Sequence, residues 1–107
     1  MKNIDVVLKF IQEEGEGKAK TKNLYIDTEN KQLINYNTVL AKINGREGQT
    51  KEIEINVDQY SVSTSKIQGY IADTLWYYIN RLNYKYIVVL TGNSRRIKHF
   101  EKRIFGE

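Results

Sequence analysis

Ser63 and Lys66 stand at the spacing Ser-x-x-Lys, which in serine acylases places a nucleophile at a helix start and a lysine one turn later. Such chemistry also needs an oxyanion hole and further motifs, and those enzymes are far longer than this chain. The serines and threonine around position 64 lead into an apolar helical pattern, as is typical of a helix N-cap. We therefore predict that Ser63 precedes a helix and that this polar cluster caps it.

The other residues that could do chemistry are one histidine and two glutamates. His99 lies among basic residues, and with no cysteine in the chain it has no partners at metal-ligand spacing. Glu52 and Glu54 alternate with isoleucines, so we place them on the outward face of a strand, where solvation explains them. The sequence predicts no catalytic residue, no metal and no cofactor, and therefore a protein that is not an enzyme.

Length and composition predict one folded domain over residues 1–107. Charged residues make up 28% and hydrophobic residues 40% of the chain, as in ordinary globular domains. No apolar run approaches the roughly 20 residues of a membrane helix. The first residues alternate charge and apolar character, unlike a signal peptide. We expect a cytoplasmic protein without membrane contact.

Hydrophobic periodicity predicts the elements that position these residues. A helix is expected over 3–14, with Ile4, Val7, Leu8 and Ile11 on one stripe, and a second helix over 65–82 that covers a sheet. The apolar run 86–90 is expected to be a strand buried on both faces. The remaining elements are strands near 24–27, 32–36, 38–43 and 51–57, and a helix over 94–105.

The order αββββαβα indicates an α+β fold. Short connections between the first strands predict an antiparallel β-meander of about four strands, joined by one later strand. The central helix packs on it, and helices stand at both ends of the chain.

Trp76 falls outside the sheet-facing arc of the central helix, beside the small residues Gly69 and Ala72. One interpretation is that Trp76 packs against another helix of the domain. The other is an exposed anchor for a partner, because tryptophan is frequent among binding hot spots. A homodimer through the Gly69, Ala72 and Trp76 face is a further possibility.

Basic residues are concentrated in the last quarter of the chain. Seven of them lie between Arg81 and Arg103, against the single acid Glu101. This asymmetry favours an anionic partner, either nucleic acid or an acidic protein surface, although a solvated helix face is equally compatible with it. The candidate binding residues are Lys66, Trp76, Arg95, Arg96, Lys98, Lys102 and Arg103.

Three stretches of the sequence resemble a known group of proteins. They are Asn23-Leu24-Tyr25-Ile26, the segment from Leu33 to Ala41, and the segment from Tyr60 to Gln68. Together they resemble a small domain of unknown function from phages and mobile elements of low-GC bacteria, and segments of some small inhibitors of CRISPR nucleases. The resemblance covers roughly residues 23–70. It implies a phage accessory protein acting in the cytoplasm of a host bacterium.

Two functions are therefore expected. The first is a non-enzymatic, anti-CRISPR-like inhibitor that binds a host nucleic-acid-guided nuclease, competing with or mimicking nucleic acid. The alternative is a small nucleic-acid-binding module that uses the basic C-terminal helix.

Overall fold

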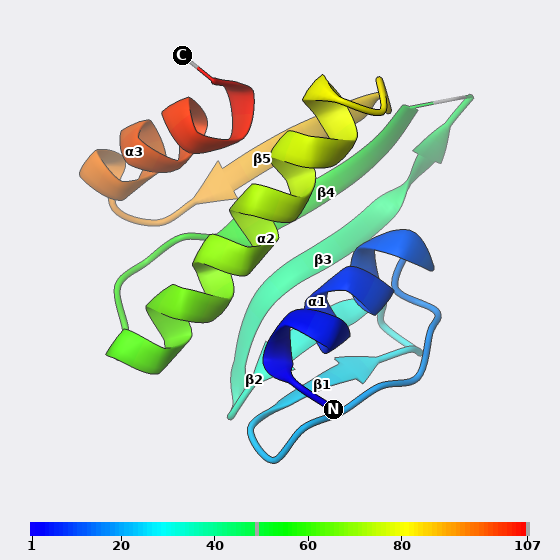
Figure 1. Cartoon of the computed structure of the whole chain (residues 1–107), viewed down its shortest axis with the longest axis vertical. Helices are drawn as coiled ribbons and strands as arrows, with labels where there is room; N and C mark the ends of the chain where they lie inside the picture. Colours follow the sequence, from blue (N-terminus) through cyan, green and yellow to red (C-terminus); the bar gives the residue numbers. More distant parts are fainter. Residues whose placement is uncertain (49, 107) are drawn as a thin grey trace.

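A computed structural model describes residues 1–48 and 50–106 of the chain (Figure 1). The element order is the predicted αββββαβα. The helices are α1 (Asn3–Gln12), α2 (Val62–Asn80) and α3 (Ser94–Phe105). The strands are β1 (Leu24–Asp27), β2 (Gln32–Asn35), β3 (Thr38–Glu47), β4 (Thr50–Asn56) and β5 (Tyr86–Thr91).

The strands form one sheet in the order β1-β2-β3-β4-β5. The pairs from β1 to β4 are antiparallel, and β5 runs parallel to β4. A parallel pair needs a crossover connection, which α2 supplies. The predicted α+β fold, with a meander of four strands and one later strand, is confirmed.

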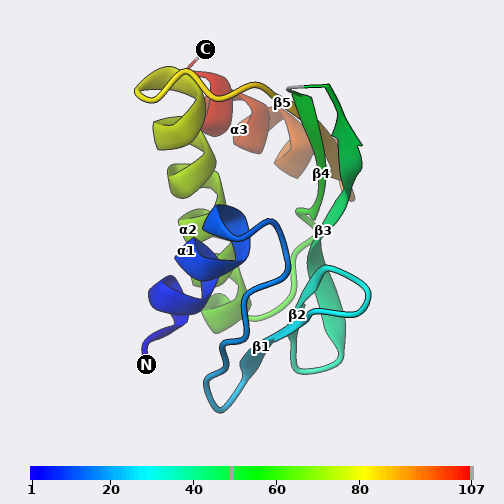
Figure 2. The same cartoon turned by 90° about the vertical axis from the view of Figure 1, so that its right-hand side faces the viewer.

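All three helices cover the same face of the sheet (Figure 2). The core between the two layers is aliphatic, with Phe10 and Phe100 as its fully or nearly fully buried phenyl rings. Alternation along β4 shows how the sheet contributes, because Ile53 and Ile55 are buried while Glu52 and Glu54 point to the other face. No helix among the described residues lies on that other face.

The prediction that the strand at 86–90 is buried on both faces was wrong. Its side chains alternate in burial, and Ile87 is 52% exposed. The physical reason is position: β5 ends the sheet, and helices cover only one face. A continuous apolar run reads the same whether a strand is buried on one face or two.

Two helix details also differ from the prediction. Helix α2 begins at Val62, because the Ser61 hydroxyl caps it by accepting from the Thr64 N–H at 3.2 Å. Ser63 therefore lies inside the first turn and does not precede the helix. In α1 the buried stripe is Val6, Val7, Phe10 and Ile11, while Ile4 is 40% exposed.

Candidate partner-binding surface

The residues of the three motif stretches meet in the interior of the protein. The Thr64 hydroxyl donates to the Asn35 side-chain oxygen at 2.7 Å, and the Asn35 amide donates to the Asn23 carbonyl at 2.9 Å. Asn35 and Thr64 are almost fully buried. Burying a polar group costs free energy unless the group is hydrogen-bonded. Here Thr64 donates to Asn35, and Asn35 donates to Asn23. These residues therefore hold α2 on the β1–β2 hairpin, which is a structural role.

Gln68 anchors the same helix to the end of β4 and the segment that follows it. Its side chain is fully buried, and its amide donates to the carbonyls of Asn56 and Asp58 at 2.9 and 2.8 Å. Its oxygen accepts from Arg96 Nη2 at 2.8 Å. Arg96 Nε also donates to the Val57 carbonyl. The guanidinium is therefore committed to the interior, so Arg96 is not a candidate for partner binding.

Arg103 is also held within the chain. Its guanidinium forms a two-pronged ion pair with Asp73 of α2, at 3.0 and 3.2 Å. It lies directly over Gly69, where an added Cβ would come within 3.0 Å of Nη2. The small residue thus makes room for the guanidinium. Arg103 joins α3 to α2 and is only partly available to a partner.

Three of the predicted basic residues remain on the outer face of α3. Arg95, Lys98 and Lys102 lie at i, i+3 and i+7, opposite the buried Phe100 and Ile104. All three are exposed, and none forms an ion pair with a residue that the structure describes. We call them the α3 basic stripe. Phe105, 40% exposed, follows at the end of the helix.

Trp76 lies where α2 meets the C-terminal end of α3. The Nε1 atom of its ring would stand 3.5 Å from a Cβ at Gly106, and Arg81 lies over the ring with 5.5 Å between its Cζ and the ring centroid. The Asn80 amide donates to the Ile104 carbonyl at 3.1 Å. Trp76 is half-buried, so it packs against a helix of its own domain and still presents part of its ring.

The proposed dimer face beside Trp76 is occupied. Gly69 and Ala72 are buried, and α3 of the same chain packs along this side of α2. A second copy therefore cannot use the Gly69, Ala72 and Trp76 face. The interpretation that Trp76 packs against another helix of the domain is confirmed, and that helix is α3.

A cluster of exposed side chains that the sequence did not predict surrounds the C-terminal end of α2. Tyr77 and Tyr84 are each 51% exposed and Leu82 is 44% exposed, next to the exposed cations Arg81 and Lys85. Tyr84 is fixed by an edge contact with Tyr78 at 5.0 Å between ring centroids. The Trp-Tyr-Tyr run was the only signal in the sequence. We call these residues, with Trp76, the aromatic end.

The aromatic end lies beside the C-terminal end of α3, the helix that carries the α3 basic stripe. Helices α2 and α3 finish at the same end of the molecule (Figure 1), and the Asn80–Ile104 bond joins them there. Lys66 stands apart, exposed near the beginning of α2. The Ser63 hydroxyl lies 3.0 Å from that of Ser61. No pairing of Ser63 with Lys66 is present among the described residues.

A hollow of about 590 Å³ lies at the start of α3, lined by Asp58, Gln59 and residues 93–96. Helix N-termini attract anions. Here the Asn93 side chain already accepts from the N–H groups of Arg95 and Arg96, and the Asp58 carboxylate accepts from the Asn93 N–H at 2.7 Å. Oxygen atoms of the protein therefore fill the positions that a phosphate would take.

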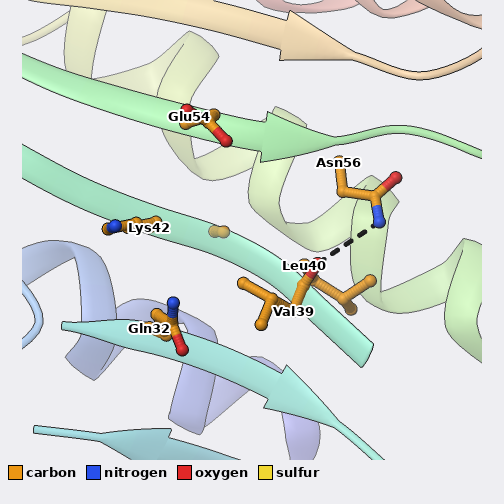
Figure 3. Close-up of a pocket in the computed structure, with 7 residues that line it drawn as sticks. Gln32, Val39, Leu40, Lys42, Glu54 and Asn56 are labelled. Carbon is orange, nitrogen blue, oxygen red and sulfur yellow. Dashed lines mark hydrogen bonds between the residues drawn. The ribbon is translucent and has the colours of Figure 1, made fainter. Parts of the chain in front are cut away.

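A second hollow, of about 260 Å³, lies on the open face of the sheet (Figure 3). Side chains from β2, β3 and β4 surround it, and the Asn56 amide spans it to the Val39 carbonyl at 3.3 Å. The β2–β3 register shifts here, between Leu33 and Ile34. The hollow is explained by this irregularity and gathers no reactive group beyond Lys42 and Glu54, which face each other across the strands.

His99 is exposed and makes an edge contact with Phe100. Within residues 1–48 and 50–106, no three His, Cys, Asp or Glu side chains are grouped so that they could hold a metal ion. None of the helices in this part of the chain is long and apolar enough to cross a membrane. The chain matches no protein family model, no curated protein and no solved structure.

Proposed function

We propose that this chain is a non-enzymatic phage accessory protein that inhibits a nucleic-acid-guided nuclease of a bacterial host by binding an acidic surface of that complex. The observation that carries the proposal is that α3, which carries the basic stripe on its outer face, ends beside the aromatic end. The resemblance of the motif stretches to small CRISPR-nuclease inhibitors supports the choice of partner. The protein would bind such a complex in the cytoplasm of the host cell.

The composition of this surface favours a protein partner. Tryptophan, tyrosine and arginine are the residues most enriched among interface hot spots, and Trp76, Tyr77 and Arg81 stand together here. Arg95, Lys98 and Lys102 carry charges that no described residue neutralises. Such charges steer an acidic partner and raise the rate of association.

A nucleic-acid-binding module is the second candidate, and the three unpaired cations of the stripe are the observation that favours it. Three phosphate contacts on duplex DNA give a slope of about −2.7 in log K against log salt. Affinity would then fall only about 40-fold between 50 and 200 mM salt, against 10³–10⁵-fold for proteins with six to ten contacts. Binding of bare nucleic acid through this stripe is therefore expected to be weak.

Charge reversal tests the proposal. The variant Arg95→Glu/Lys98→Glu/Lys102→Glu should lose binding to, and inhibition of, a purified guided nuclease complex of a low-GC host. The matched control reverses three lysines of another exposed segment, Lys18→Glu/Lys20→Glu/Lys22→Glu, which changes net charge equally. Equal loss in both variants would reject a specific surface.

A second experiment separates the two candidates. Binding of the unmodified protein to 20-base-pair DNA is titrated at several salt concentrations, with and without the nuclease complex. Tight binding to bare DNA that the stripe variant abolishes, with no inhibition of cleavage, would establish the nucleic-acid module and overturn the inhibitor. Inhibition that persists after Tyr77→Ala/Tyr84→Ala would remove the aromatic end from the proposed contact.

A further inference from the structure

The open face of the sheet, on the side away from the three helices, combines exposed aliphatic side chains with carboxylates (Figure 2). On β5, Ile87 is 52% and Val89 is 37% exposed. On β4, Glu52 and Glu54 are half-buried beside them, because the parallel register sets Glu52 against Ile87 and Glu54 against Val89. Two acids and two aliphatic residues therefore form adjacent rows, which we call the open-face patch.

The carboxylates of the open-face patch are not neutralised within the described part of the chain. Neither forms an ion pair there. The Asn44 amide donates to Glu52 at 2.7 Å and to Glu54 at 3.4 Å, but an amide carries no charge. Lys42 stands opposite Glu54 on β3, on the side away from β5. The patch is therefore negative, on a chain whose net charge is +4.

The spacing within the patch matches the spacing along a helix. Two residues of a strand span about 6.6 Å, and positions i and i+4 of a helix are about 6 Å apart along its axis. Cations at i and i+4 of a helix laid along β4 would therefore each reach one carboxylate. Positions i+3 and i+7 lie beside them, and in one of the two directions along β4 they face β5, about 4.8 Å away. Aliphatic side chains there would cover Ile87 and Val89.

We propose that the open-face patch binds an amphipathic helix of a partner protein, with lysine or arginine at i and i+4 and aliphatic residues at i+3 and i+7. Charge complementarity selects this occupant, because two carboxylates repel nucleic acid and acidic proteins and attract a basic helix. Packing supports it, since helices already cover the opposite face of the same sheet. The contact is separate from the α3 basic stripe and does not rest on the proposed function.

A second copy of this chain fits the patch less well than another polypeptide does. Its α3 has Lys98 and Lys102 at i and i+4, but Glu101 stands at i+3, where the patch presents aliphatic side chains. A carboxylate buried there without a partner would cost free energy. Helices α1 and α2 each hold a single lysine and no arginine, Lys9 and Lys66, so neither supplies two cations.

A peptide titration tests the patch. The probe is an alanine-rich helical peptide of about 16 residues, with lysine at i and i+4 and leucine at i+3 and i+7 in its middle turns. NMR spectra of the isotope-labelled protein should show the largest shifts at the backbone N–H groups of β4 and β5, with an affinity that falls as salt rises. Matched peptides replace both lysines by glutamate, or both leucines by serine, and each should bind about tenfold more weakly or not at all.

Charge-removing variants of the protein test the carboxylates. Glu52→Gln/Glu54→Gln keeps the shape of both side chains and should weaken binding of the lysine–leucine peptide about tenfold. The matched control, Glu29→Gln/Glu101→Gln, removes two exposed acids outside the patch and changes the net charge equally. It should bind the peptide like the unmodified protein.

The aliphatic row has its own test. Ile87→Thr/Val89→Thr keeps the β-branched shape that suits a strand and replaces one methyl or ethyl group of each side chain by a hydroxyl. This variant should also bind the peptide more weakly, and its remaining affinity should depend on salt as before. Circular dichroism of each variant establishes that the loss does not come from unfolding.

The proposal is overturned if the lysine–leucine peptide does not bind at millimolar concentration, if the glutamate peptide binds equally well, or if the shifts centre on another surface. Light scattering covers the remaining occupant: an unmodified chain that associates with itself, and that Glu52→Gln/Glu54→Gln makes monomeric, would assign the patch to a second copy and overturn the proposal as well. None of these measurements involves a nuclease, so their failure and the failure of the proposed function are distinguishable.

Discussion

The Thr64 hydroxyl donates a 2.7 Å hydrogen bond to the side-chain oxygen of Asn35 in the interior, joining the first turn of α2 to the end of β2. Thr64 is 3% exposed and Asn35 is 2% exposed, so water cannot replace this bond. The same hydroxyl lies 3.0 Å from that of Ser61, the N-cap. One threonine therefore connects the capping of α2 with its position on the sheet.

Thr64→Val should reduce the free energy of unfolding by about 1–3 kcal/mol, because valine keeps the shape but leaves the Asn35 oxygen buried without a donor. Urea denaturation measures the change. The control Thr91→Val removes an exposed hydroxyl whose bond to the Ile55 carbonyl is 3.4 Å long, and should change stability by less than about 0.5 kcal/mol. Equal effects at the two sites would contradict the buried bond.

Substitution by methionine should lower the stability of the protein at Arg96 but not at Arg95. Arg96→Met removes the donors to Gln68 and Val57 and should cost about 1.5–3 kcal/mol of stability. Arg95→Met changes an exposed residue and should leave the free energy of unfolding within about 0.5 kcal/mol. Under the proposed function, Arg95→Met instead weakens partner binding. Thermal unfolding and binding, measured on both variants, separate the two roles.

A destabilised Arg95→Met protein, or an Arg96→Met protein of unchanged stability, would mean that the two side chains have been assigned to the wrong environments.

Gly92 should be far less tolerant of alanine than Gly45. Each has φ of +128°, a backbone conformation that L side chains rarely adopt, so both substitutions carry strain of about 1–3 kcal/mol. At Gly92 the added Cβ would also lie 2.8 Å from the Asp58 backbone nitrogen, whereas at Gly45 nothing lies within 4 Å. The difference between the two measured free energies of unfolding therefore reports the clash alone. No difference would contradict the close approach of residues 58 and 92.

The order of elements was predictable because each signal is local. Alternation along 51–57 marks a strand, and Ser and Thr before an apolar pattern mark a helix start. The surroundings of β5 were not predictable in this way. Whether Ile87 and Val89 are covered depends on where three helices pack, and all three lie on the other face.

The site was less predictable than the fold for the same reason. Arg95 and Arg96 are identical neighbours in the sequence, yet about 100° of helix rotation turns one to solvent and the other to Gln68. The ion pair of Arg103 was not predictable, because its partner Asp73 lies thirty residues earlier in the sequence. The aromatic end consists of exposed side chains at and just after the C-terminal end of α2. Hydrophobic periodicity does not predict that exposure.

Hydrogen bonds from Asn30, first from its side chain and then from its backbone, hold the pKa of Asp27 below its ordinary value. The amide lies 2.9 Å from Oδ2 and the backbone N–H 3.3 Å from Oδ1, within the β1–β2 turn. A carboxyl whose pKa is lower in the folded state contributes stability above its unfolded pKa. That contribution is lost as the pH falls through the folded pKa.

Asn30→Ala should therefore raise the pKa of Asp27 toward 3.8, because only the backbone donors remain. The side-chain carboxyl shift in NMR spectra, followed between pH 2 and 6, measures this. The variant should also lose less stability than the unmodified protein between pH 5 and pH 2, since it has less of this contribution to lose. Asn37→Ala, in the next turn, keeps both donors and should leave the Asp27 titration unchanged; a shift there would mean that the whole hairpin, and not the Asn30 bond, sets the pKa.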